Sequence, residues 1–230
     1  MQLNLIINYG VLKMNINVNN VNLYYEVYGD GDPIMLLHGN SETHEIFDKL
    51  IEKLKDKYKV YAIDSRCHGK SEDTKIISYE LMRDDVICFI KKLNISKPIL
   101  YGFSDGGNIG LLVSIKEPDI LFKLIISGAN LNPKGMKKRM YIMCKLGYLI
   151  TKNKLFKMMC EEPNIQINDL EKIKIPTIIL AGEKDVIKLK HTKLIANKIK
   201  NSKLEIIKNE NHGSYIIHTD KIFNIIKKYI

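Results

Sequence analysis

The chain has 230 residues, of which 45% are hydrophobic and 27% are charged. This length and composition fit one globular domain that buries a full core. The sequence contains no apolar run of about eighteen residues, and its first residues lack the basic and apolar segments of a secretion signal. We therefore expect a cytoplasmic protein with no integral membrane association.

The formal net charge is +10. Because the lysines are spread over nearly every expected helix, the sequence favours neither a nucleic-acid partner nor an anionic membrane. The densest basic cluster, at residues 134–139, remains a possible attractant for an acidic substrate. The four cysteines show no C-x-x-C pairing and are expected to be free thiols. We expect a small-molecule acyl substrate as partner, and a monomer or homodimer.

The expected elements begin with an antiparallel hairpin. Residues 15–18 and 23–28 alternate apolar and polar side chains around Asn19-Asn20, which is typical of two strands at the edge of a sheet. The turn 29–33 ends the hairpin. The continuous apolar run 34–37 then predicts a strand covered on both faces, followed by a helix over 41–55.

The rest of the chain alternates strands and helices. Strands are expected at 60–63, 99–103, 124–126, 177–180 and 204–207, and helices at 79–93, 106–115, 191–200 and 215–229. This order predicts an α/β fold: a mostly parallel, doubly wound sheet of about eight strands with helices on both faces. Residues 1–230 are treated as a single domain whose recognisable core begins near residue 14.

One interval interrupts the alternation. Residues 129–174 contain no clear buried strand, and Pro133, Gly135, Gly147 and Pro163 divide their helical stretches. An insertion between two strands of an open α/β sheet lies over the carboxyl ends of the strands, where such sheets bind ligands. We expect 129–174 to form a small helical cap between core strands 6 and 7.

The segment Gly102-Phe103-Ser104-Asp105-Gly106 is typical of a nucleophile elbow. It follows an apolar strand and opens a helix, which is the setting that this motif requires. A serine on so sharp a turn has strained dihedral angles, and the small residues two positions away relieve the crowding. Ser104 is therefore the candidate nucleophile.

A serine hydroxyl needs a histidine to accept its proton and a carboxylate to orient that histidine. Asp185 follows the strand 177–180 and is the candidate acid, with Glu183 in the same loop as its main competitor. His212 follows the strand 204–207 and is the candidate base. The chain order Ser, Asp, His is the order expected for an elbow serine.

Acyl transfer also needs an oxyanion hole, formed by two fixed backbone N–H groups. One is expected from Asp105, at the amino terminus of the helix after Ser104. The other is expected from Asn40, in the loop His38-Gly39-Asn40 after the strand 34–37. The sequence implies no metal or cofactor, because the turn around Gly31 explains the neighbouring Asp30 and Asp32.

Five ordered motifs together resemble those of the α/β-hydrolase family, over about residues 14–230. They lie at 37–40, 64–71, 102–107, 181–185 and 211–213. The resemblance implies a Ser104, Asp185, His212 triad, an oxyanion hole from Asn40 and Asp105, and a structural loop at 64–71. Many relatives carry an aromatic residue or glycine where this chain has Asn40, which changes the polarity beside the acyl site.

The expected activity is hydrolysis of a small carboxylic ester through an acyl-enzyme. Thioesterase, amidase, carbon–carbon hydrolase and acyltransferase activities stay open, as does a non-catalytic protein that binds a small ligand on the same scaffold. Substrate contacts are expected from the acyl-site loop and from apolar cap residues that line an adaptable pocket. The alternative for each of these cap residues is that it packs the cap helices onto the body. The contacts are His38, Gly39, Met136, Met140, Met143 and Phe156, with Leu146, Leu149, Met158 and Met159 as further candidates.

Overall fold

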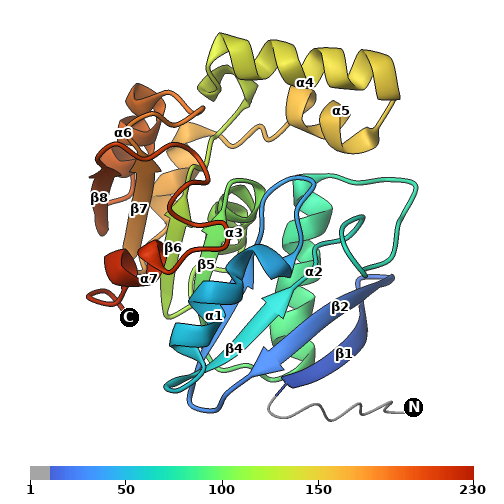
Figure 1. Cartoon of the computed structure of the whole chain (residues 1–230), viewed down its shortest axis with the longest axis vertical. Helices are drawn as coiled ribbons and strands as arrows, with labels where there is room; N and C mark the ends of the chain where they lie inside the picture. Colours follow the sequence, from blue (N-terminus) through green and yellow to red (C-terminus); the bar gives the residue numbers. More distant parts are fainter. Residues whose placement is uncertain (1–10) are drawn as a thin grey trace.

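The computed structural model describes residues 11–230 and contains one eight-stranded sheet in the order β1-β2-β4-β3-β5-β6-β7-β8 (Figure 1). Residues 1–10, part of the basis for expecting no secretion signal, lie outside the described residues. The strands are β1 (Val11–Val18), β2 (Val21–Tyr28), β3 (Asp32–Leu37), β4 (Tyr58–Ile63), β5 (Ile99–Phe103), β6 (Lys123–Ser127), β7 (Thr177–Gly182) and β8 (Ser202–Ile207).

The sheet is mostly parallel. Strand β2 pairs antiparallel with both β1 and β4, and the other neighbouring strands are parallel. The expected hairpin therefore lies at one edge, but β1 begins at Val11 and its register with β2 runs from Val11 opposite Tyr28 to Val18 opposite Val21. The expected α/β fold class is confirmed.

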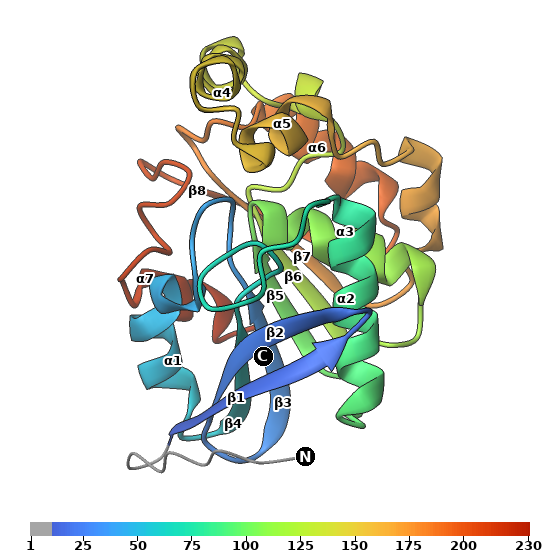
Figure 2. The ribbon, with the colours of Figure 1, turned by 90° about the vertical axis from the view of Figure 1, so that its right-hand side faces the viewer.

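Helices cover both faces of the sheet (Figure 2). On one face lie α1 (Asp48–Leu54) and α7 (Lys221–Ile226), and on the other lie α2 (Tyr79–Lys92), α3 (Asp105–Lys116) and α6 (Leu189–Lys198). Alternate side chains of each strand supply the two cores. In β5, Leu100 packs in the cluster with α2, α3 and α6, whereas Ile99 and Tyr101 pack in the cluster with α1 and α7.

Two helices are shorter than the sequence predicts. The first is divided into a 3-10 helix, η1 (His44–Phe47), which the Thr43 side chain caps, and α1. The last begins only at Lys221, because His218 has a left-handed φ of 50° and donates its backbone N–H to Ile46. A non-glycine residue in that conformation interrupts a helix.

Between β6 and β7 the chain forms η2 (Pro133–Gly135), α4 (Lys138–Thr151), α5 (Lys154–Glu161) and η3 (Ile167–Lys172). Helix α5 lies between α4 and the body of the protein (Figures 1 and 2). The η3 segment, however, packs into the main core through Leu170, as does Ile173 directly after it. Within the described residues, no helix is both long and apolar enough to cross a membrane.

Candidate active site

The site lies where the strand order of the sheet reverses. Strand β3 pairs with β4 on one side and with β5 on the other. The loops after β3 and β5 therefore leave the carboxyl ends of these two strands in different directions. This is the place where open α/β sheets bind ligands. Ser104 follows β5, and residues 38–42 follow β3.

Ser104 has the strained backbone that a nucleophile elbow requires. Its φ is 52° and its ψ is −112°, far from the regions that L-residues normally occupy. Its backbone N–H donates to Ser127 O at 2.8 Å, which fixes the turn against β6. A Cβ at Gly106 would lie 2.1 Å from the carbonyl oxygen of Leu37, so only glycine allows the helix to start this close to β3.

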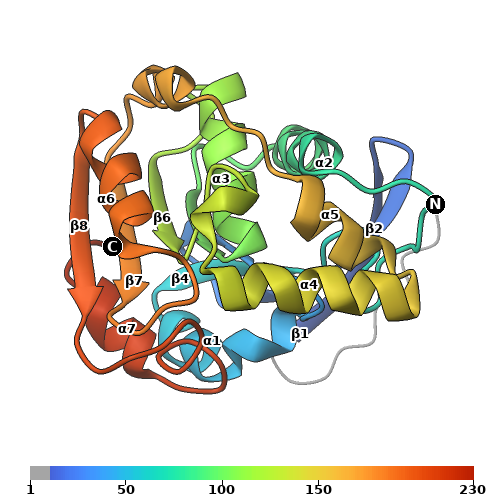
Figure 3. The same ribbon diagram turned by 90° about the horizontal axis from the view of Figure 1, so that it is seen from above.

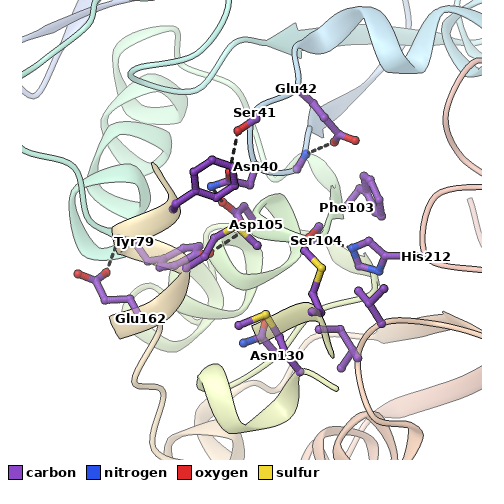
Figure 4. A pocket seen from close by; sticks show the side chains of 17 residues that line it. Asn40, Ser41, Glu42, Tyr79, Phe103, Ser104, Asp105, Asn130, Glu162 and His212 are labelled. Carbon is purple, nitrogen blue, oxygen red and sulfur yellow. Dashed lines mark hydrogen bonds between the residues drawn. The ribbon is translucent and has the colours of Figure 1, made fainter. Parts of the chain in front are cut away.

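The three residues expected to act together are in hydrogen-bonding contact. Nε2 of His212 lies 3.0 Å from Oγ of Ser104, and Nδ1 lies 2.7 Å from Oδ1 of Asp185. Asp185 is fully buried, and its Oδ1 also accepts the backbone N–H of Ile187 at 2.8 Å. The His212 ring stacks obliquely on Phe103, with 4.9 Å between ring centroids (Figure 4).

Glycine 128 makes room for this histidine. It follows β6 with a φ of 66°, and a Cβ there would lie 2.5 Å from Cε1 of His212. This role of Gly128 was not predicted from the sequence. Its place directly after a buried strand was the available signal, because a glycine there often marks a left-handed turn or a close approach.

The competing acid and histidines have other partners. Glu183 is exposed and accepts the backbone N–H of Asn209 at 2.9 Å. Among the histidines, His44 lies 2.7 Å from Asp64 through Nδ1, and His191 accepts the backbone N–H of Leu131 at 2.9 Å. None of these residues contacts Ser104 or His212 through a hydrogen bond in the described part of the chain.

The two amides expected to form an oxyanion hole are free to donate. Among residues 11–230, no acceptor is hydrogen-bonded to the backbone N–H of Asn40 or Asp105. The Asn40 side chain donates to Oδ2 of Asp105 at 3.0 Å, and Gly106 donates its N–H to His38 O at 3.1 Å. These contacts hold the loop after β3 against the first turn of α3.

Tyr79, at the start of α2, also positions Asp105. Its hydroxyl donates to Oδ1 of Asp105 at 2.7 Å, and both side chains are buried. Burial raises the pKa of the Asp105 carboxyl, against the hydrogen bonds from Tyr79 and Asn40 that lower it. Tyr79 was missed from the sequence because 26 residues separate it from Asp105.

A cavity of about 220 Å³ opens beside Ser104 (Figure 4). Gly39, Met136, Met140 and Phe156 line it, as expected from the sequence. Further lining residues come from both the body and the cap: Asn40, Ser41, Glu42, Tyr79, Phe103, Ser104, Asp105, Asn130, Met159, Glu162, Val186, Ile187 and His212.

Two expected substrate contacts need correction. His38 does not line the cavity: it is buried, with Nε2 accepting the backbone N–H of Ser65 at 3.0 Å. Burial and the nearby His68 lower the pKa of His38 to about 4, consistent with a neutral structural imidazole. Met143 lies about one turn after Met140 on α4, yet its side chain is 59% exposed and does not line the cavity.

The other cap candidates divide in the same way. Leu146 and Leu149 are each 52% exposed on the outer face of α4, whereas Met158 is buried in the main core. Met159 alone among them lines the cavity. Apolar side chains occur around much of the circumference of α4, so its sequence alone does not show which of them face the cavity.

Known proteins resemble this chain in sequence and in fold. The family model described as alpha/beta hydrolase fold matches residues 32–146. The chain belongs to the alpha/beta hydrolase family. The AB hydrolase superfamily protein YisY of Bacillus subtilis (strain 168) is 28% identical over 255 residues, covering 91% of this chain and 95% of that protein.

Other members of the alpha/beta hydrolase family match part of the sequence or share the fold. The sn-1-specific diacylglycerol lipase ABHD11 of Danio rerio is 33% identical over 113 residues, which span 46% of this chain but only 35% of that lipase. An esterase from Exiguobacterium antarcticum superposes with a TM-score of 0.84 at 21% identity, covering 95% of this chain and 99% of that one. That structural likeness shows the shared fold.

Within this alpha/beta hydrolase, the cavity is more acidic than the chain as a whole. Glu42 and Glu162 line it, and none of its lining residues in the described structure is a lysine or arginine. Burial raises the pKa of Glu42 to about 6, although the N–H of Gly39, which donates to it at 2.9 Å, and His212 oppose this shift. Burial also raises the pKa of Glu162.

The described residues 11–230 contain no group of three or more histidine, cysteine, aspartate or glutamate side chains arranged to hold a metal ion. The four cysteines are free. Among the residues that line the cavity, Ser104 and His212 are the hydroxyl and imidazole that lie in hydrogen-bonding contact, at 3.0 Å.

Proposed function

We propose that the chain is a serine hydrolase that cleaves a small carboxylic ester, or a related acyl compound, through an acyl-enzyme. The observation that carries this proposal is the hydrogen-bonded series from Ser104 Oγ through His212 to the buried Asp185, opening into a cavity. A serine so connected is activated as a nucleophile at neutral pH.

In the first half-reaction, Ser104 Oγ attacks the carbonyl carbon as its proton moves to Nε2 of His212. The carbonyl π electrons move to oxygen, which forms a tetrahedral oxyanion. When the carbonyl re-forms, the bond to the alcohol oxygen breaks, and His212 gives its proton to the departing alcohol. The product of this step is an ester between the acyl group and Ser104.

In the second half-reaction, water takes the place of the alcohol. His212 accepts a proton from water as the water oxygen attacks the acyl carbon, and it returns the proton to Ser104 Oγ when the acyl bond breaks. Asp185 remains ionised and fixes the tautomer and direction of the imidazole. The carboxylic acid then leaves, and the starting state of the protein is restored.

The backbone N–H groups of Asn40 and Asp105 stabilise the oxyanion in both steps. The Asp105 amide lies at the amino terminus of α3, where the helix dipole also favours negative charge. A preorganised donor of this kind typically contributes about 10²–10³-fold to the rate. The cavity of about 220 Å³ favours a substrate with a short acyl group.

The first experiment is labelling with a fluorescent fluorophosphonate, which reacts covalently with an activated serine. We expect the parent protein to be labelled and Ser104→Ala to remain unlabelled, with both proteins equally folded by circular dichroism. A parent protein that resists the probe yet binds a small ligand tightly would support a ligand-binding protein instead.

A panel of p-nitrophenyl esters of increasing chain length then defines the substrate class. Hydrolysis is expected to be fastest for short acyl groups, because the cavity has a volume of only about 220 Å³ and is lined by the bulky side chains of Met136, Met140 and Phe156. Addition of alcohols or thiols to the same assay distinguishes hydrolysis from acyl transfer. If the acyl group goes to a dilute alcohol or thiol faster than to water, the chain is an acyltransferase and the hydrolase proposal is wrong.

A further inference from the structure

Helix α4 lies on the outside of the cap, over α5 and the body of the protein (Figure 3). It carries a row of large apolar side chains that are exposed. Its opposite face packs on α5, where Cys144 is buried and Gly147 meets the ring of Phe156. At ~100° per residue, the outward apolar side chains fall within an arc of about 120°. They are Ile142 (44% exposed), Met143 (59%), Leu146 (52%), Leu149 (52%) and Ile150 (81%).

This row differs from the other exposed apolar side chains of the described structure, which lie singly. Leu12, Ile76, Phe122, Leu194 and Ile217 are on five different segments. Single exposed apolar residues are normal on a protein surface, whereas a contiguous apolar patch marks an interaction site. The outer row of α4 is therefore the patch that needs a partner.

The charge around this row indicates the chemistry of the partner. Residues 129–160 contain eight lysine and arginine residues and no aspartate or glutamate, so they carry most of the net charge of +10. Lys138 and Lys145 are seven residues apart on α4 and therefore follow one edge of the apolar row. Lys152 directly follows the end of the helix, and its Nζ lies 5.6 Å from the centroid of the Tyr148 ring. Within the described residues, the ion pairs of this segment involve Lys154 and Lys157 rather than these three.

We propose that the outer face of α4 docks on the surface of an anionic lipid bilayer. The apolar row enters the boundary between head groups and acyl chains, and the three edge lysines contact the phosphate and carboxylate groups of the lipids. Helices that lie in this interface combine a strong apolar face with lysine-rich flanks. Each cation near an anionic leaflet adds about a factor of five to binding.

Two features favour a bilayer over a second copy of this chain. A pair of α4 helices packed through their apolar rows would bring two cationic segments together with no carboxylate between them, which opposes association. The five side chains also offer less area than the ~800 Å² per partner of a stable protein interface. An anionic surface satisfies both the apolar row and its charge.

The sequence predicted no membrane partner, because lysines occur in nearly every expected helix and the cluster at 134–139 indicated at most an acidic substrate. The structure adds that basic side chains of this segment lie beside exposed apolar ones. The inner face of α4 supplies Met140 to the cavity, so docking would bring the cavity to within about one helix diameter, ~10 Å, of the lipid. Docking itself does not depend on the proposed hydrolysis.

The test is vesicle flotation with the full chain at low ionic strength. We expect binding to phosphatidylcholine vesicles that contain about 30% phosphatidylserine, and at least tenfold weaker binding to phosphatidylcholine alone. The triple variant Lys138→Glu, Lys145→Glu, Lys152→Glu is expected to weaken binding to the anionic vesicles about a hundredfold or more.

A matched control has the same change in net charge elsewhere. Lys53, Lys55 and Lys57 are exposed on and after α1, away from the cap (Figure 1). The triple variant Lys53→Glu, Lys55→Glu, Lys57→Glu is expected to bind within threefold of the parent protein. Equal losses in the two triple variants would mean that overall charge alone drives binding, and would overturn the proposal.

Insertion of the apolar row into lipid can be followed by tryptophan fluorescence. The chain contains no tryptophan, so a single introduced tryptophan gives the whole signal. Leu149→Trp is expected to show a blue-shifted emission on vesicle binding and quenching by brominated lipid, whereas Ile76→Trp, at an exposed loop position, is expected to show neither. Leu146→Ser with Ile150→Ser is expected to weaken binding at least tenfold, and Phe122→Ser is expected to have little effect.

Other outcomes overturn the proposal directly. One is the absence of vesicle binding by a protein whose circular dichroism shows that it is folded. Another is a dimer in sedimentation velocity that Leu146→Ser dissociates, together with no affinity for vesicles, which would assign the row to a second copy. All the substituted side chains are exposed, so the melting temperature is expected to stay within a few degrees of the parent value.

Discussion

The carboxyl edge of the sheet, called the rim below, and the outer face of the cap differ in how firmly their side chains are held. At the rim, Ser104, His212 and Asp185 each have fixed partners, and Gly128 and Gly106 allow close approaches that any other residue would block. On the cap, Met143, Leu146 and Ile150 point into solvent. A site built for chemistry restricts its groups, whereas a surface for docking leaves them free.

The largest expected effect is at the rim. Replacing Ser104 or His212 with alanine should lower kcat for a p-nitrophenyl ester by about 10⁴–10⁶-fold, because each removes a partner from the same proton-transfer unit. The double variant should be little worse than either single variant. Steady-state kinetics on proteins of equal circular dichroism measures this, and additive losses would contradict a single catalytic unit.

A second prediction compares one glycine in each region. Gly128→Ala should displace the His212 ring and lower kcat by about a hundredfold, since a misplacement near 1 Å has this cost. Gly147→Ala, in the cap, meets only the Phe156 ring at 3.0 Å and gains helix propensity, so kcat should change less than threefold. Similar losses in both variants would show that the cap is as constrained as the rim.

These residues also show how much of the site could be predicted from the sequence. Ser104, Asp185 and His212 were predictable because each follows a buried strand, and strand ends meet at one edge of the sheet. Asn40 and Asp105 were predictable for the same reason, although their catalytic roles stay a proposal. Gly128 and Tyr79 were missed, because their contacts with the site join segments far apart in the chain. Glu42 was missed although it lies only three residues from Gly39, because a single glutamate in a loop gives no sign of whether it is buried.

The cap was less predictable on physical grounds. Helix α4 is apolar both toward the cavity and toward solvent, so its sequence predicts a helix but not which methionine faces inward. Met140 was assigned correctly to the cavity and Met143 incorrectly. The burial of His38 depends on Ser65 and His68, from the loop after β4, which no local pattern around residue 38 reveals.

A third prediction concerns the support beneath the oxyanion loop. Tyr79→Phe removes the hydroxyl that donates to the buried Asp105 carboxyl, which loosens the contact between Asp105 and Asn40. We expect kcat to fall about tenfold with KM nearly unchanged, the pattern of a loss confined to the transition state. An increase in KM alone would indicate that Tyr79 contacts the substrate instead.

The smallest expected effect is on stability, at Glu42. A carboxyl whose pKa is raised to about 6 in the folded protein binds its proton more tightly there than in the unfolded chain. The free energy of unfolding therefore falls as the pH rises from the unfolded pKa of Glu42 to about 6, stays lowered above that pH, and shows no such penalty below the unfolded pKa.

Glu42→Gln should accordingly raise the free energy of unfolding by about 1–2 kcal/mol at pH 8, and by almost nothing at pH 4. Urea unfolding at both pH values measures the difference. Glu52, which is exposed on α1 and paired with Lys49, provides the control, because Glu52→Gln should not raise the free energy of unfolding at pH 8. A gain at pH 4 as large as that at pH 8 would show that ionisation of Glu42 is not its cause.

The most direct test of the central claim is to trap the acyl-enzyme. Parent protein mixed with excess p-nitrophenyl acetate and quenched within milliseconds to seconds should carry one acetyl group, and peptide mass spectrometry should locate it on Ser104. His212→Ala should acquire almost none in the same time. An acetyl group on another residue, or rapid ester turnover with Ser104 never modified, would contradict covalent catalysis by this serine.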